Sequence, residues 1–206
     1  MQFGCGLCAP VEWENYDASP TLRIQKLPVI GTLLSNKLNV QFPENVFYGD
    51  ITNGLPVEEN SCDGVYSSHT LEHLSFDDFR KALRNVYKIL KPDGVFRCVI
   101  PDLEAAARQY LTDVEINKPE ASINFMQNTL LGKEKRERGF KSLAKALFGN
   151  SHHLWMWDRI SLKNELINAG FKKVRECHFN DSEDEMFKFV EDPDRFVKAV
   201  AMECKK

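Results

Sequence analysis

The stretch 63-DGVYSSHTLEHLSFDDFRKALRNVYKILKPDGVFRCVIP-101 decides the fold class of this chain. Residues 63–68 are typical of a short strand, and apolar residues then recur at helical spacing between Phe76 and Leu90. Residues 95–100 form a nearly continuous apolar strand that ends at Pro101. A strand that is apolar on both faces and follows an amphipathic helix is typical of a buried parallel sheet. The pattern predicts an α/β fold.

Short strands are also expected upstream of this unit. Residues 1–3 read as a strand that runs directly into Gly4-Cys5-Gly6, and residues 13–17 form a second strand that ends in an acid. A short helix is expected within residues 21–40, and a third strand at residues 46–48. The prediction is a Rossmann-like, mostly parallel sheet with helices on both faces.

Downstream, residues 103–150 have helical patterns that are too long for a simple crossover. We interpret them as a helical insertion, or lid, within a single domain that spans residues 1–206. Its helices are expected at 103–114, 121–131 and 134–148. They should pack on the sheet through apolar side chains, namely Leu103, Tyr110, Leu111, Phe125, Leu130 and Leu147.

The end of the chain predicts one more helix and a strand pair. The helix covers residues 160–169 and is followed by Gly170, a residue that favours the end of a helix. Two strands, at 173–179 and 196–204, then enclose an acidic loop, and the C-terminal strand is expected to be antiparallel.

Composition excludes several classes of protein. The formal net charge of -3 does not suit a nucleic-acid-binding protein, and we expect no nucleic-acid partner. No apolar run reaches the ~18 residues of a membrane span, and the N-terminus does not resemble a signal peptide. The six cysteines are read as reduced, although Cys5 and Cys8 have the spacing of a redox or zinc pair. A cytoplasmic protein is expected, whose oligomeric state the sequence leaves open.

The glycine turn and the acid after it indicate a nucleoside-containing cofactor. Glycine at positions 4 and 6 permits a tight turn and a close approach to a ligand, because neither residue has a Cβ. Asp17 ends the next strand, where a carboxylate can accept hydrogen bonds from both hydroxyls of a ribose. An ordinary surface aspartate at a strand end is the alternative.

An ordered series of motifs then resembles a known family. The series is Gly4-Cys5-Gly6, Tyr16-Asp17-Ala18-Ser19-Pro20, Gly49-Asp50-Ile51, Leu55-Pro56, Asp63-Gly64-Val65, His69-Thr70-Leu71-Glu72-His73-Leu74 and Leu90-Lys91-Pro92-Asp93-Gly94. It resembles the class I S-adenosylmethionine-dependent methyltransferases of the type 11 superfamily. It is especially similar to a branch of small bacterial predicted methyltransferases that is often linked with cell-surface glycan genes.

The resemblance implies S-adenosylmethionine as the cofactor and roles for several of these residues. The turn of Gly4, Cys5 and Gly6 would face the methionine part of the cofactor, and Asp17 would hold its ribose. Asp50 would accept a hydrogen bond from the adenine amino group, and the Ile51 N–H would donate to the ring. Ser67 and Ser68 would line the cofactor site at the end of their strand.

Three histidines are candidates for a general base. His69 directly follows the fourth strand, where an acceptor should lie, although it could simply cap that strand. His152 and His153 follow the insertion, and we expect them to return to the same edge of the sheet as His69. Glu72 and His73 are read as structural or close to the cofactor, and Trp155 and Met156 as core residues. We expect no metal; the alternative is a zinc site made by His69, His73, His152 and His153.

The expected activity is methyl transfer to a hydroxyl of a small-molecule or glycan acceptor, the glycan being implied by the resemblance alone. A non-catalytic methyltransferase-like protein or partner subunit is the alternative. A nicotinamide oxidoreductase would share the glycine turn and the ribose acid. It is less favoured, because the sequence has no G-x-G-x-x-G fingerprint for a pyrophosphate.

Overall fold

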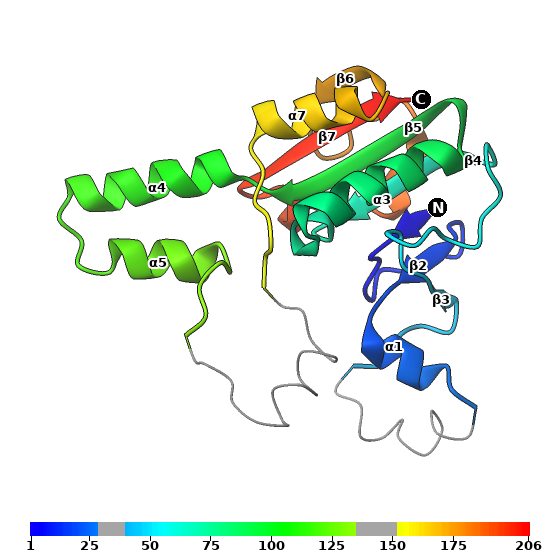
Figure 1. Cartoon of the computed structure of the whole chain (residues 1–206), viewed down its shortest axis with the longest axis horizontal. Helices are drawn as coiled ribbons and strands as arrows, with labels where there is room; N and C mark the ends of the chain where they lie inside the picture. Colours follow the sequence, from blue (N-terminus) through cyan, green and yellow to red (C-terminus); the bar gives the residue numbers. More distant parts are fainter. Residues whose placement is uncertain (29–39, 135–151) are drawn as a thin grey trace.

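The computed structural model describes residues 1–28, 40–134 and 152–206 and contains one central sheet (Figure 1). Its seven strands have the order β3-β2-β1-β4-β5-β7-β6. Their bounds are β1 Gln2–Phe3, β2 Asn15–Asp17, β3 Val46–Tyr48, β4 Cys62–Ser68, β5 Leu90–Pro101, β6 Lys172–Glu176 and β7 Ala199–Lys205. The predicted α/β class is confirmed.

Strands β1 to β5 are parallel, and β7 pairs antiparallel with both β5 and β6. Phe3 is in register with Tyr16, Asp17 with Tyr48, and Ser68 with Val99. The carboxyl ends of β1 to β5 therefore meet at one edge of the sheet. In open α/β sheets this edge is where ligands bind.

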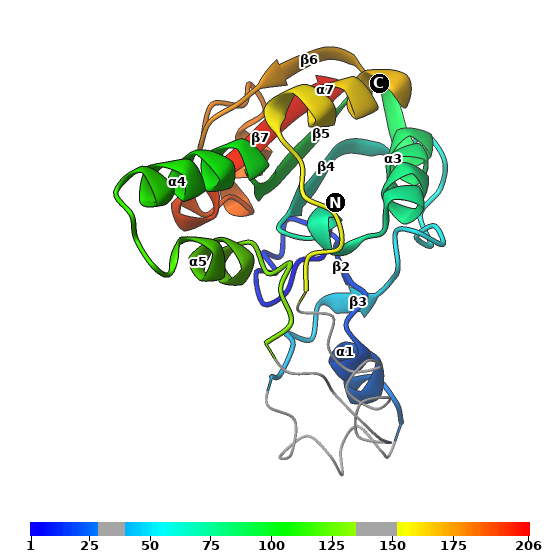
Figure 2. The same ribbon diagram turned by 60° about the vertical axis from the view of Figure 1, so that its left-hand side comes forward.

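One face of the sheet is covered by helices α3 (Phe76–Ile89) and α7 (Arg159–Asn168), as Figures 1 and 2 show. Helix α3 begins after Ser75, whose hydroxyl accepts a hydrogen bond from the Asp78 N–H and so caps the first turn. The apolar stripe of α3 and the buried Leu162 and Leu166 of α7 join the strands in the largest hydrophobic cluster. At the end of α7, Gly170 has a φ of 102°, as its predicted capping role requires.

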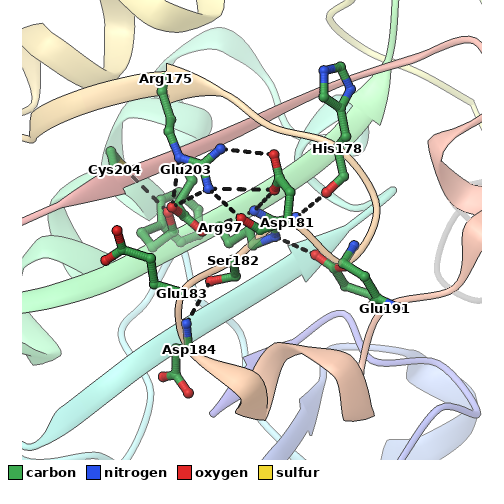
Figure 3. A network of polar contacts seen from close by, with 12 residues as sticks. Arg97, Arg175, His178, Asp181, Ser182, Glu183, Asp184, Glu191, Glu203 and Cys204 are labelled. Atoms are coloured by element: carbon green, nitrogen blue, oxygen red, sulfur yellow. Dashed lines mark hydrogen bonds and ion pairs between the residues drawn. The ribbon is translucent and has the colours of Figure 1, made fainter.

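Beneath β4, β5 and β7, the opposite face is covered by the segment between β6 and β7. This segment contains two 3-10 helices, Glu185–Phe189 and Pro193–Phe196. It is fixed to the sheet by Arg97, a fully buried residue of β5 (Figure 3). The Arg97 guanidinium forms ion pairs with Asp181, Glu191 and Glu203. Because a buried charge without partners is strongly destabilising, we interpret this network as structural.

The insertion begins with helices α4 (Leu103–Glu115) and α5 (Ala121–Asn128), which form a hairpin that projects from the sheet (Figures 1 and 2). The prediction that it packs on the sheet through its apolar residues is wrong for Leu111 and Leu130, which are 57% and 42% exposed. Tyr110 packs on Phe125 inside the hairpin, with ring centroids 5.6 Å apart. The predicted helix 134–148, including Leu147, falls almost entirely outside the described residues.

Two short helices complete the description. Helix α1 (Pro20–Gln25) lies between β2 and β3 in the chain, and the 3-10 helix η2 (Leu71–His73) follows β4. Within the described residues, no helix is both long and apolar enough to cross a membrane.

Candidate active site

The glycine turn after β1 lies at the carboxyl edge of the sheet, and its two glycines have different reasons to be glycine. Both have left-handed backbones, with φ of 64° at Gly4 and 55° at Gly6. A Cβ on Gly4 would lie 2.0 Å from the Thr70 hydroxyl oxygen, whereas a Cβ on Gly6 would meet no atom within 4 Å. Thr70 therefore closes one side of the turn. The other side is open for a ligand, as a cofactor site requires.

The acid at the end of β2 is held against this turn. One carboxylate oxygen of Asp17 accepts a hydrogen bond from the Gly6 N–H at 2.9 Å, and the other accepts from the Ser19 N–H at 2.7 Å. Each carboxylate oxygen has about two acceptor positions, so each keeps one for a ligand. Asp17 is partly exposed, and its two free positions suit the two hydroxyls of a ribose.

Asp50 follows β3 at the same edge. Its carboxylate accepts hydrogen bonds from the backbone and hydroxyl of Thr52 and from the side-chain amide of Asn53, at 2.7 to 2.8 Å. The side-chain amide of Asn85 in α3 donates to the Ile51 carbonyl at 2.7 Å. These contacts fix the loop in which the adenine contacts of Asp50 and Ile51 are predicted.

Strand β4 ends in two serines beside the glycine turn. The hydroxyls of Ser67 and Ser68 are buried and have no hydrogen-bond partner among the described residues. His69 follows with a φ of 50°, a backbone that non-glycine residues seldom adopt. Its Nε2–H donates to the Arg195 carbonyl at 2.8 Å, since a carbonyl oxygen can only accept. The remaining ring nitrogen, Nδ1, therefore carries the lone pair.

The segment 152–157 returns from the insertion to this edge, as predicted. The backbone N–H groups of Leu154 and Trp155 both donate to the Glu72 carbonyl, at 2.8 and 3.2 Å. The Leu103 N–H donates to the Trp157 carbonyl at 2.9 Å. The segment is thereby held against both η2 and the end of β5.

This docking surrounds the Glu72 carboxylate with imidazoles. Its Oε1 lies 3.6 Å from His69 Nδ1, 4.0 Å from His73 Nε2 and 3.9 Å from His153 Nε2. The Glu72 side chain is 1% exposed, and neither of its oxygens has a hydrogen-bond partner among the described residues. Burial raises the pKa of Glu72 to about 8.

Burial also acts on the histidines of this cluster. It lowers the pKa of His153 to about 4, with a smaller contribution from the neighbouring His73. Burial lowers the pKa of His69 as well. Both imidazoles are therefore neutral at neutral pH, and a neutral imidazole can act as a base or bind a metal.

The structure thus brings His69 and His153 together, but it separates His152 from them. The His152 ring contacts the Leu130 carbonyl at 3.2 Å, and His152 contributes only its own carbonyl, which accepts a hydrogen bond from His73 Nδ1. Glu72, at the centre, was read from the sequence as structural or close to the cofactor. The sequence signal for this cluster is that His69 precedes Glu72 by three residues and His73 directly follows it.

The tryptophans of the same segment correct another prediction. Trp155 is 43% exposed, so it is not the core residue that the sequence suggested. Trp157 is 2% exposed and packs on Phe76 and Phe79 in the main cluster. Met156 is half-buried, and its sulfur lies 3.3 Å from His153 Nδ1.

A cavity lies between α4 and α5. It begins at Pro101 and Asp102, where β5 ends, and it includes Met156. Aromatic and amide side chains line it, among them Tyr110, Asn124, Phe125 and Asn128. It is the candidate acceptor pocket, because it adjoins the carboxyl edge of the sheet and reaches the residue that contacts His153.

The strand order is that of a Rossmann-like fold, and the glycine turn and the strand-end acids lie at its ligand-binding edge. Residues 2–98, a little under half of the chain, match a family model described as a methyltransferase domain. Residues 2–98 therefore carry a methyltransferase domain, and S-adenosylmethionine is the cofactor that this domain and its strand-end acids support. No curated protein is similar enough in sequence to match.

Solved structures agree with this fold. One is described as an S-adenosylmethionine-dependent methyltransferase, possible histamine N-methyltransferase, from Thermotoga maritima. Over 100% of this chain and 80% of that one, the TM-score is 0.50 at 19% identity. A methyltransferase from Archaeoglobus fulgidus has 16% identity and a TM-score of 0.48, over 100% of this chain and 84% of its own. At 19% identity, the likeness to the Thermotoga maritima protein shows the fold alone.

Proposed function

We propose that this protein transfers a methyl group from S-adenosylmethionine to a hydroxyl of a small-molecule or glycan acceptor, with His69 as the general base. The observation that carries the proposal is the shared edge of the sheet. There the turn of Gly4 and Gly6, Asp17 and His69 follow the ends of three adjacent parallel strands. A base at the end of β4 therefore lies next to the predicted methionine site.

The chain supplies binding, orientation and proton removal. When bound, S-adenosylmethionine provides the electrophilic methyl on its sulfonium, and its transfer to oxygen leaves S-adenosylhomocysteine. Asp17 would hold the ribose, and Ser67 and Ser68 would line the methionine site. His69 Nδ1 would accept the proton of the acceptor hydroxyl as the new O–C bond forms.

The hydroxyl acceptor is supported by the chemistry of the candidate pocket. Tyr110 and Phe125 offer aromatic faces on which a sugar or other ring can stack. Asn124 and Asn128 offer amides that can both donate to and accept from hydroxyl groups. A His152 or His153 base stays a prediction; His69 is preferred because the ring of His152 points to Leu130 and His153 is 7% exposed.

Replacement of His69 tests this function. With an acceptor found by screening small hydroxylated and glycan compounds, His69→Ala should lower turnover about 10²–10⁴-fold. Its affinity for S-adenosylhomocysteine, measured by calorimetry, should not change. Unchanged turnover would exclude His69 as the base.

A ligand screen separates the proposal from its alternatives. S-adenosylhomocysteine should raise the thermal midpoint of unfolding, and NAD should not. Stabilisation by NAD instead would favour an oxidoreductase. Cofactor binding without turnover on any acceptor would favour a non-catalytic partner subunit.

A further inference from the structure

The Glu72 carboxylate has surroundings that no step of methyl transfer explains. It is 1% exposed, and both of its oxygens are without hydrogen-bond partners among the described residues. Three imidazole nitrogens lie 3.6 to 4.0 Å from its Oε1. Leaving buried polar atoms unpaired costs free energy, so such an arrangement points to a missing ligand.

The hydrogen bonds of the imidazoles show which ligand is missing. His73 Nδ1 faces the His152 carbonyl at 3.0 Å and must donate, which leaves the lone pair on Nε2. His153 Nδ1 lies 3.3 Å from the sulfur of Met156, a weak acceptor, and the tautomer that donates to this sulfur has its lone pair on Nε2. Both lone-pair nitrogens face the carboxylate. Once the Glu72 carboxyl is ionised, only acceptors face one another here, which is the environment of a cation.

We propose that Glu72, His73 and His153 bind one zinc ion, or a similar divalent transition metal. One ligand atom from each residue lies within 4.8 Å of the other two. Tetrahedral zinc, with bonds of about 2.0–2.1 Å, places its ligand atoms roughly 3.3 Å apart. The observed separations from Glu72 Oε1, 4.0 Å to His73 and 3.9 Å to His153, exceed this by about 0.6–0.7 Å, so the three side chains must move together when the ion binds.

The chemistry of the ligands selects the metal. Two imidazoles and one carboxylate suit zinc and its transition-metal neighbours, whereas magnesium and calcium prefer all-oxygen sites. Three protein ligands leave a fourth coordination position open, as in catalytic zinc sites. His69 Nδ1, 3.6 Å from Glu72 Oε1, borders the group.

The surroundings also have the outer contacts that a metal site needs. The His73 ring is oriented by its hydrogen bond to a backbone carbonyl, the usual second partner of a metal-binding histidine. His153 is held in place because the segment 152–157 is hydrogen-bonded to the Glu72 carbonyl. The His73 side chain is 29% exposed, which gives an ion a path from solvent.

A role for the ion in catalysis rests on the proposed function. An acceptor hydroxyl in the fourth coordination position would be more acidic, because a bound cation stabilises its deprotonated form. His69 would then take the proton at lower cost. Binding of the ion itself needs neither cofactor nor acceptor, so it can be tested separately.

Zinc alone is the probe for the test. The tag-free chain, stripped of metal and carrying Cys8→Ser to remove its exposed thiol, should bind one zinc ion per chain in competition with a chromophoric chelator. Glu72→Gln and His153→Ala should each weaken zinc binding by at least ~100-fold, since losing a ligand exceeds the 10–100-fold effect of losing an outer contact. His73→Ala should weaken zinc binding by the same factor, and because His73 is more exposed than His153, its replacement should disturb the fold less.

The matched control is His152→Ala, a neighbouring histidine whose ring faces away from Glu72. It should keep its zinc affinity within about threefold, well below the loss expected for a ligand. Circular dichroism and S-adenosylhomocysteine binding establish that each variant is folded. Absence of stoichiometric zinc binding in the Cys8→Ser chain would overturn the proposal. So would full affinity in folded Glu72→Gln, His73→Ala or His153→Ala.

Discussion

Replacing Asp17 by alanine tests the cofactor site most directly. The Asp17 carboxylate accepts one hydrogen bond from Gly6 and one from Ser19, which leaves two acceptor positions for the ribose hydroxyls. A hydrogen bond to a charged group contributes about 1.5–3 kcal/mol. A net loss of about 1.5 kcal/mol corresponds to tenfold weaker binding, and a loss of about 3 kcal/mol to roughly 150-fold.

We therefore expect Asp17→Ala to weaken binding of S-adenosylhomocysteine by about 10- to 150-fold in isothermal titration calorimetry. Asp63→Ala is the matched control, because Asp63 is an exposed aspartate near the opposite end of β4 that pairs with Lys91. Its affinity should equal that of the unchanged chain. Equal affinities for Asp17→Ala and Asp63→Ala would refute the assignment of Asp17 to the ribose.

Three further predictions concern the turn, the fold and the hairpin. Gly4→Ala should lower the free energy of unfolding more than Gly6→Ala does in urea titrations, because only the Gly4 methyl would collide with Thr70; equal losses would contradict this reasoning. Asp158→Ala should cost about 1 kcal/mol of unfolding free energy, since Asp158 caps α7 through Ile160 and Ser161. Hydrogen bonds from Ser161 lower the pKa of Asp158 in the folded chain. The stabilisation by Asp158 is therefore present above about pH 3.9 and is lost as the pH falls through the pKa of the folded state. In urea titrations from about pH 6 to about pH 3, the free energy of unfolding should fall less in Asp158→Ala than in the unchanged chain. Amide hydrogens of α4 and α5 should exchange faster than those of β5, and more slowly once cofactor and acceptor bind; uniform protection of both would indicate a rigid insertion instead of a lid.

The sequence by itself determined the class of fold, and it located the glycine turn and the strand-end acid that we propose bind the cofactor. Apolar periodicity marks β4, α3 and β5, because each element buries a face whose spacing is set by its own backbone. The glycines at 4 and 6 and the acid at 17 could be read in the same way. A tight turn and a strand end impose local requirements that glycine and aspartate meet, although the contact of Gly4 with Thr70 appears only in the folded chain.

Only the tertiary structure decided what surrounds Glu72. His153 is far from Glu72 in the chain, and it reaches the carboxylate because the segment 152–157 is hydrogen-bonded to the Glu72 carbonyl. The same docking buries Trp157 and leaves Trp155 exposed, although both residues look equally apolar in sequence. The left-handed backbone of His69 and the 3-10 turn at residues 71–73 then set the directions of the side chains. The spacing of residues within a segment predicts which of them share a helix or strand face. The contact between two distant segments depends instead on hydrogen bonds between their backbones, and the spacing within either segment does not predict those bonds.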